Sequence, residues 1–226
     1  MFKLIKKSAL GTAAALAFCA VSQLATAGPL GVSIAGQVCF DGQPCDLNAA
    51  ANQVTVIAGT SVGITLPAGF TATIGTSFSN NPGGTGGFSI LDLTWTVSTI
   101  GAIGGPLTII SSQDGFTFGG GTAGHLSSTI SGDLLNGSLT AQQFLNSLTP
   151  GVQGPFTAPF TSTLGLDLVL PASYSLSEFL SFTMGANGTS TGDFRSLVTR
   201  VPEPGTLALL GLALAGMGFV WRRKQA

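Results

Sequence analysis

The sequence predicts an all-β domain, a sandwich or a jelly-roll-like fold, and three observations predict it. Apolar residues recur at every second position in several short stretches, which is the pattern of half-buried strands. Gly-rich clusters separate these stretches, and the chain holds 33 glycines in 226 residues. Ser and Thr supply 43 of the residues between 28 and 200, whereas only 8% of the whole chain is charged, against about 25% in an ordinary domain.

The clearest alternation runs through residues 91–97, 164–170 and 174–184, with a bend expected at Glu178 and Phe179, where the last pattern breaks. One helix is predicted over residues 140–148, because Phe144, Leu145 and Leu148 fall at helical spacing and a proline follows. Turns are expected at residues 80–84, 119–121 and 187–188. Shorter candidate strands are residues 32–40, 53–57, 62–66, 70–78, 107–112 and 115–118.

The N-terminus, residues 1–27, is predicted to be a helical signal peptide. Three lysines in the first seven residues precede an uncharged, Ala-rich stretch over residues 8–21. Ala25 and Ala27 supply the small residues that signal peptidase requires, so we expect cleavage before Gly28 and export of residues 28–200 as one β-rich domain.

The C-terminus is predicted to hold a single transmembrane helix over residues 206–221. Residues 207–221 carry no charge and span about 22 Å as a helix, so membrane thinning or snorkelling must cover the remainder of the bilayer core. Arg222, Arg223 and Lys224 follow at once in a basic tail, residues 222–226. The positive-inside rule places this stop-transfer tail in the cytoplasm.

A short motif, Val201-Pro202-Glu203-Pro204, stands immediately before this helix. The motif over residues 201–205, the apolar helix and the basic terminus together resemble the PEP-CTERM sorting signal of Gram-negative bacteria. The resemblance covers residues 201–226. It implies that an exosortase recognises the motif and removes the helix, after a transient stay in the inner membrane. It also implies release to the cell surface or the extracellular matrix.

Cys39 and Cys45 are the cysteines that remain after the expected signal-peptide cleavage. In an exported chain we expect them to form a disulfide, and closing so small a ring stabilises the fold by roughly 2 kcal/mol. No metal or other cofactor is expected, because the chain has one histidine and its carboxylates are scattered singly.

Two catalytic or cofactor-binding sequence motifs occur in the chain, but neither has the secondary structure around it that the motif requires. Ser61 and Ser190 each lie in a G-x-S-x-G string, but neither has the strand before and helix after that a nucleophile elbow needs. The Gly-x-Gly-x-x-Gly string over residues 119–124 has no helix after it, so it does not indicate a dinucleotide site. His125 would have to serve any Ser–His–Asp triad, with Asp114 or Asp133, but the simpler interpretation is a solvated histidine at a strand edge.

The charge of the predicted exported domain excludes one class of function. Residues 28–200 hold two arginines, no lysine and eight acidic residues, a net charge of −6, which argues against nucleic-acid binding. We expect a non-catalytic surface or extracellular-matrix protein associated with exopolysaccharide or biofilm. The alternatives are a secreted carbohydrate-active hydrolase, with two carboxylates about 5–10 Å apart in a cleft, and an adhesin or ice-like surface-binding protein. An exposed aromatic platform near Trp95 or Tyr174 would favour sugar binding. A flat, regular Thr array would favour the surface binder, and none is evident in the linear sequence.

Overall fold

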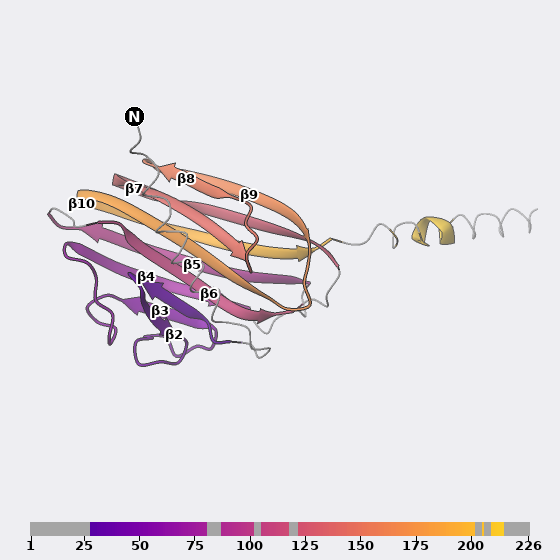
Figure 1. Cartoon of the computed structure of the whole chain (residues 1–226), viewed down its shortest axis with the longest axis horizontal. Coiled ribbons are helices and arrows are strands. Elements are labelled where there is room, and N and C mark those ends of the chain that lie inside the picture. The colour runs from indigo at the N-terminus through magenta and orange to yellow at the C-terminus, as the bar shows by residue number, and fades with distance from the viewer. Residues whose placement is uncertain are drawn as a thin grey trace, which may run out of the picture.

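The computed structural model describes residues 28–80, 87–101, 105–117, 122–201, 205 and 209–214. The body between residues 28 and 201 is all-β, as the sequence predicts (Figure 1). Its strands in chain order are β1 (Gly31–Ile34), β2 (Gln37–Phe40), β3 (Gln53–Ile57), β4 (Phe70–Ser79), β5 (Phe88–Thr99), β6 (Leu107–Phe116), β7 (Ala123–Leu145), β8 (Val152–Phe156), β9 (Phe160–Val169) and β10 (Tyr174–Arg200).

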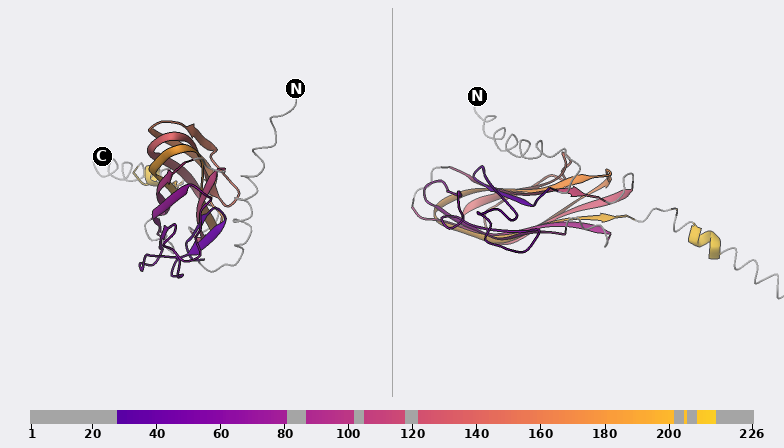
Figure 2. Two further views of the ribbon diagram at one scale, coloured as in Figure 1. Left: turned by 90° about the vertical axis from the view of Figure 1, so that its left-hand side faces the viewer. Right: turned by 90° about the horizontal axis from the view of Figure 1, so that it is seen from below.

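The strands form two facing layers joined through two long strands (Figure 2). The first layer contains β2, β1, β6, the first half of β10, the second half of β7, and β8. The second layer contains β3, β4, β5, the second half of β10, the first half of β7, and β9. All of these pairings are antiparallel, so the fold is a β-sandwich in which β7 and β10 belong to both layers.

The passage of β7 and β10 between layers occurs at a shared irregularity. The β7–β10 register shifts between Met184 and Thr189. Asn187 on β10 and Asn136 on β7 both adopt positive φ here, 55° and 52°, a region that Asn tolerates better than most residues. The expected turn at residues 187–188 is therefore wrong: those residues bend a continuous strand.

Apolar side chains from the inner faces of both layers fill the core. Trp95 of β5 and Phe182 of β10 pack edge to face across it, with ring centroids 6.1 Å apart. Tyr174 lies stacked on Phe116 and donates a hydrogen bond to Ser89 of the opposite layer, 2.8 Å. The alternation predicted over residues 91–97 corresponds to this inner face of β5.

A polar layer crosses this core. Glu178 of β10 is fully buried and accepts a 2.7 Å hydrogen bond from Ser196 of the facing layer. Gln143 of β7 stands opposite Glu178 in the register and is also fully buried. Gln153 of β8 donates a 2.6 Å bond to Ser128, again from one layer to the other. These five residues define the polar layer, and its two hydrogen bonds, Ser196 to Glu178 and Gln153 to Ser128, join the two sheets at mid-core.

Further local predictions are wrong. The candidate strand over residues 32–40 is a hairpin in which β1 pairs with β2, and the candidates over residues 107–112 and 115–118 share one strand, β6. Residues 140–145 belong to β7, and Leu145 and Leu148 then form an isolated bridge, so there is no helix at 140–148. Residues 62–66 form turns and irregular backbone instead of a strand. The β10 register runs without a shift through Glu178 and Phe179, so no bend occurs there. The expected turns at 81–84 and 119–121 lie outside the described residues.

Beyond the β-body, the described residues include one short C-terminal segment. Residues 209–214 are helical and extend away from the body (Figure 1). None of the helices among the described residues has the length and hydropathy that crossing a membrane requires. The expected transmembrane helix, residues 206–221, falls mostly outside those residues, and the expected signal peptide, residues 1–27, falls outside them completely.

Candidate functional site

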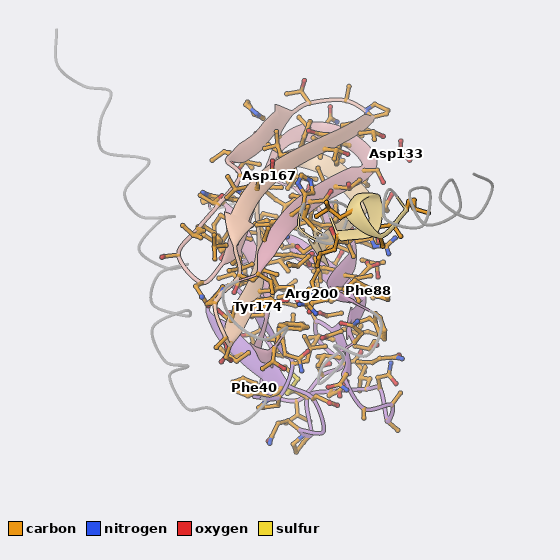
Figure 3. The ribbon with its side chains drawn as sticks, turned by 90° about the vertical axis from the view of Figure 1, so that its right-hand side faces the viewer. Phe40, Phe88, Asp133, Asp167, Tyr174 and Arg200 are labelled. Atoms are coloured by element: carbon orange, nitrogen blue, oxygen red, sulfur yellow. A yellow bond between two sulfur atoms is a disulfide. The ribbon has the colours of Figure 1, made fainter. Side chains whose placement is uncertain are left out.

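The C-terminal sorting residues follow directly from the end of β10. Val201 donates its backbone N–H to Ala123, 2.9 Å, at the end of the β7–β10 ladder. Figure 3 shows this end of the body, with Phe88 and Arg200 labelled. Pro202, Glu203, Pro204, Arg222, Arg223 and Lys224 lie outside the described residues, as do Ala25 and Ala27. Gly28 is described: it is half-buried, and its carbonyl accepts a hydrogen bond from Gln113, 3.3 Å.

The described part of the C-terminal apolar segment does not pack on the sandwich. Its four leucines are 57–69% exposed: Leu209, Leu210, Leu212 and Leu214. In water this exposure is unfavourable, since each fully buried leucine is worth about 1.5–3 kcal/mol. The segment therefore suits an apolar environment that the β-body does not provide.

The outer face of the second layer carries a concentration of hydroxyl side chains. Strand alternation turns them outward on five adjacent strands, while the intervening residues point into the core. We call this surface the hydroxyl face. Its members, all exposed or half-buried, are Thr71, Thr73, Thr94, Thr96, Ser98, Thr129, Ser131, Thr161, Thr163, Thr189 and Thr191.

Strand register arranges part of the hydroxyl face in rows. Thr71, Ser98 and Thr189 stand side by side on β4, β5 and β10. Thr73, Thr96 and Thr191 form the next row on the same strands. Neighbouring strands are about 4.8 Å apart and same-face residues about 6.8 Å apart along a strand, so these six residues form a regular lattice. The sequence shows each strand's threonines, but only the pairing register shows that they align.

Two carboxyl groups interrupt the hydroxyl face. Asp92 of β5 hydrogen-bonds to Asp193 of β10, and Arg195 stands opposite Asp92 in the register. Burial, and then the hydrogen bond and the negative charge of Asp193, raise the pKa of Asp92 to about 7, although Arg195 opposes the shift. Strand alternation places Asp133 of β7 and Asp167 of β9, both exposed, on the same face, so the hydroxyl face is acidic. Nothing in the linear pattern indicated the Asp92–Asp193 pair, because 100 residues separate its members.

His125 also lies on this outer face. Its Nδ1 is 2.6 Å from Oδ1 of Asp167 on β9, so its partner is neither Asp114 nor Asp133, the two aspartates considered for a triad. The ring lies over Gly165, where an added Cβ would come within 2.9 Å of it. Both members of the pair are solvent-exposed, with 42% of the histidine side chain and 87% of the aspartate side chain accessible.

The two G-x-S-x-G serines do not serve as nucleophile elbows. Ser190 lies within β10, is 1% exposed, and accepts a 3.0 Å hydrogen bond from the Trp95 indole N–H. Ser61 is 5% exposed and accepts the backbone N–H of Ile57, 3.1 Å. Both hydroxyls therefore support local structure. Among the described residues, no group of three or more His, Cys, Asp or Glu is arranged to hold a metal ion.

Cys39 and Cys45 are joined by a disulfide in the structure, with Cα atoms 5.8 Å apart. Both residues are buried, and the bridge closes the loop after β2 onto the core. Asp46, next to the bridge, accepts backbone N–H groups from Asn48 and Thr55, both at 2.9 Å. The disulfide is a structural element at the end of the body opposite the edge strands β8 and β9 (Figure 1).

Trp95 and Tyr174 do not provide the aromatic platform that would favour sugar binding. Each is only 2% exposed and packs in the core. Any saccharide contact on this body must therefore use polar groups or the scattered exposed aromatics, such as Phe78 and Phe88, which are 36% and 40% exposed on the outer face of β4 and β5.

The molecule is thus an all-β sandwich with a hydroxyl-rich outer face and an exposed apolar segment at its C-terminus. A family model described as the PEP-CTERM protein-sorting motif matches residues 200–224. The chain is a PEP-CTERM sorting motif-containing protein. The motif implies export, transient membrane association and sorting toward the cell surface.

Comparison with curated proteins finds no match. Among solved structures, the enzymatically active domain of tailspike protein 4 of bacteriophage CBA120 is similar over 71% of this chain and 21% of its own length, at 12% identity and a TM-score of 0.31. The structure titled "CBM4 structure and function" is similar over 71% and 96%, at 16% identity and a TM-score of 0.30. The C-terminal CBM6 of LamC, a marine laminarinase from Zobellia galactanivorans, is similar over 66% and 99%, at 11% identity and 0.25. At these TM-scores we draw no argument from the likenesses.

Proposed function

We propose that this protein is a non-catalytic component of the cell surface or extracellular matrix that associates with exopolysaccharide through its hydroxyl face. The sorting motif at residues 200–224 is the observation that carries the first part, because it directs a protein outward. The hydroxyl face supports the second part. Eleven Ser and Thr side chains on one sheet surface can donate and accept hydrogen bonds with sugar hydroxyls.

Processing follows the order of segments along the chain. Signal peptidase removes residues 1–27, the β-body from residue 28 to residue 200 is translocated, and residues 201–226 hold it at the inner membrane. Exosortase then cuts at the motif and frees the body from its apolar segment. The exposure of Leu209–Leu214 side chains away from the sandwich supports this arrangement, since the body loses no packing when that segment leaves.

Binding to the exopolysaccharide fraction of the native host tests the function. The double variant Thr96→Glu, Thr191→Glu places two charges in the second hydroxyl row, where sugar contacts would be displaced. We expect at least a tenfold weaker binding than wild type. The matched control is Thr183→Glu, which changes an exposed threonine on the outer face of the opposite layer and should leave binding unchanged.

Equal loss of binding in the control, or full binding by the double variant, would show that the hydroxyl face does not bind the polysaccharide. If the wild type itself did not bind, the proposed polysaccharide association would be wrong, whereas the proposed export would be unaffected. Circular dichroism of each variant should show the wild-type β spectrum, since all three positions are exposed.

One observation favours the alternative of an adhesin or ice-like surface binder. The two rows Thr71–Ser98–Thr189 and Thr73–Thr96–Thr191 form the regular array that such a binder needs. Thermal hysteresis in dilute solution, abolished by Thr96→Glu, would favour it over polysaccharide association. The hydrolase alternative gains no such support from Asp92 and Asp193, because their direct hydrogen bond leaves no room for a glycosidic bond between them.

A further inference from the structure

The edges of the two layers differ in how well they are protected. Among the strands in the described part of the chain, β2, β3, β8 and β9 each pair with one neighbour only. Three of these have features that discourage pairing with another chain. β2 has four residues, β3 has a register shift between Val54 and Val56, and β8 has a register shift in its ladder and contains Pro155.

β9 has none of these protective features. It is ten residues long and pairs with β7 from Phe160 to Val169 without a register shift. It contains no proline and no lysine, and Asp167 is its one charged residue. A long, regular and weakly charged edge is a template for adding another strand.

The backbone groups of β9 that face away from β7 can be assigned from one hydrogen bond. Leu170, which continues the strand, donates its N–H to Thr122 on the β7 side, 2.9 Å. Because backbone direction alternates along a strand, the even-numbered residues of β9 bond to β7. The odd-numbered residues, Thr161, Thr163, Gly165, Asp167 and Val169, therefore direct their N–H and C=O groups to the open edge.

The inner face of β9 is incompletely covered. Its even-numbered residues point into the sandwich but remain half-buried, whereas four of the five β7 residues that pair with them are buried: Gly124, Leu126, Ser128 and Ile130. The opposing edge strand of the other layer, β8, has half the length of β9, which leaves this margin of the core partly open. The half-buried apolar residues at this margin are Phe160, Leu164, Leu166 and Leu168.

We propose that β9 pairs antiparallel with β9 of a second copy of this chain, centred on Leu164. This register pairs odd residues with odd residues, so outer faces meet outer faces and inner faces meet inner faces. Thr163 meets the partner's Gly165 and Thr161 meets the partner's Asp167, and these hydrogen-bonded pairs supply about eight backbone bonds. On the inner side Leu164 meets its own copy, and Phe160 meets the partner's Leu168.

Charge and surface chemistry agree with a second copy as the occupant. Asp167 is placed against a threonine, three pairs from the centre, so the two copies of this carboxylate stand far apart. The outward threonines of β9 continue the hydroxyl face across the junction. The dimer therefore has one hydroxyl face that runs over ten strands, in place of two hydroxyl faces of five strands each.

Sedimentation equilibrium of the exported protein tests the pairing. The wild type should have twice the protomer mass at micromolar concentration. Thr163→Pro removes an N–H on the open edge and should weaken dimerisation at least tenfold. It also removes the 3.1 Å side-chain hydrogen bond to Thr129 of β7, which Thr163→Ala removes equally. Thr163→Ala, which keeps the N–H, should dimerise as wild type, and thermal melting shows whether the proline variant is folded.

Cross-linking tests the register independently. Leu164 and its copy form a non-hydrogen-bonded pair, with Cα atoms about 4.5 Å apart, within the range a disulfide spans. Leu164→Cys should give a reducible covalent dimer on mild oxidation. Ser162→Cys, which faces the partner's Leu166, is the matched control and should remain uncross-linked. A monomeric wild type, a dimeric proline variant, or equal cross-linking at positions 162 and 164 would each overturn the proposal.

Discussion

Replacing Glu178 by glutamine should make the protein more stable at neutral pH and less sensitive to pH. The carboxyl is fully buried in the polar layer, opposite Gln143, and Ser196 donates its hydroxyl to Oε1. Burial raises the pKa of Glu178 well above its usual range. The hydrogen bond from Ser196 opposes the rise, whereas the negative charges of Asp92 and Asp193 add to it.

The size of the effect follows from proton linkage. In the unfolded chain the carboxyl titrates near its reference pKa of about 4.3. The folded state holds the proton to a higher pH, so stability is fully present below about pH 4.3 and is lost as the pH rises toward the folded-state pKa. Within that window each pH unit lowers the free energy of unfolding by about 1.4 kcal/mol. Glutamine has no proton to lose, so the variant avoids this loss.

Urea unfolding at half-unit steps from pH 4.5 to pH 7.5 measures the effect. We expect the free energy of unfolding of the two proteins to diverge with rising pH, and Glu178→Gln to be the more stable at pH 7. Asp92 also titrates in this range, and because its charge acts on Glu178, its contribution cancels only in part in the difference. Parallel curves for wild type and variant would show that Glu178 binds no extra proton on folding and would refute the reasoning. Gln143→Glu, at the neighbouring buried position, should steepen the pH dependence instead.

Three further predictions concern other parts of the chain. Gly192→Ala should destabilise the sandwich by about 1–3 kcal/mol and shift the tryptophan fluorescence, because the new Cβ would come within 2.4 Å of the Trp95 ring. The control Thr191→Ala changes an exposed neighbouring residue and should change neither the stability nor the fluorescence. Cys39 and Cys45 should resist alkylation in the exported protein until it is reduced, and labelling without reductant would disprove the bridge in that form. Glu203→Ala should leave export intact but retain the protein in the inner membrane of an exosortase-containing host. Release at the wild-type rate and size would mean that exosortase does not recognise the motif.

The sequence predicts the fold class because strand alternation is a local property. Residues 91–97 and 164–170 alternate, and both form strands whose apolar residues face the core. The helix predicted over residues 140–148 fails for the opposite reason. The helical spacing of Phe144, Leu145 and Leu148 is weak evidence beside the long pairing of β7 with β10, which starts more than 25 residues further along the chain.

At Asn187 and Gly188 the sequence predicts the local backbone conformation correctly but the path of the chain wrongly. The sequence predicts a turn, and Asn187 does adopt the positive φ that turns require. The structure uses that backbone freedom to bend β10 between layers, opposite Asn136, without reversing the chain. Only knowledge of the β7 partner separates the two outcomes.

The candidate face could be predicted only in part. The outward placement of Thr94 and Thr96 follows from alternation alone. Their alignment with Thr73, Thr191 and Asp193 depends on register across strands about 20 to 100 residues apart, which pattern reasoning does not supply. Glu178 is missed because hydropathy assigns a glutamate outward, whereas its position in β10 shares the phase of the core residues.

The position of β10 determines how the body bears mechanical load. While the C-terminal segment is held at the membrane, drag on anything bound to the body pulls through residue 200, the last residue of β10. β10 is 27 residues long and lies between β7 on one side and β5 and β6 on the other. A pull along its axis loads both ladders in shear, so many hydrogen bonds must break together before the strand slides out. A chain tethered through a short edge strand would instead open one bond at a time, so the connectivity that places the sorting signal after β10 also gives the sandwich its most resistant point of attachment.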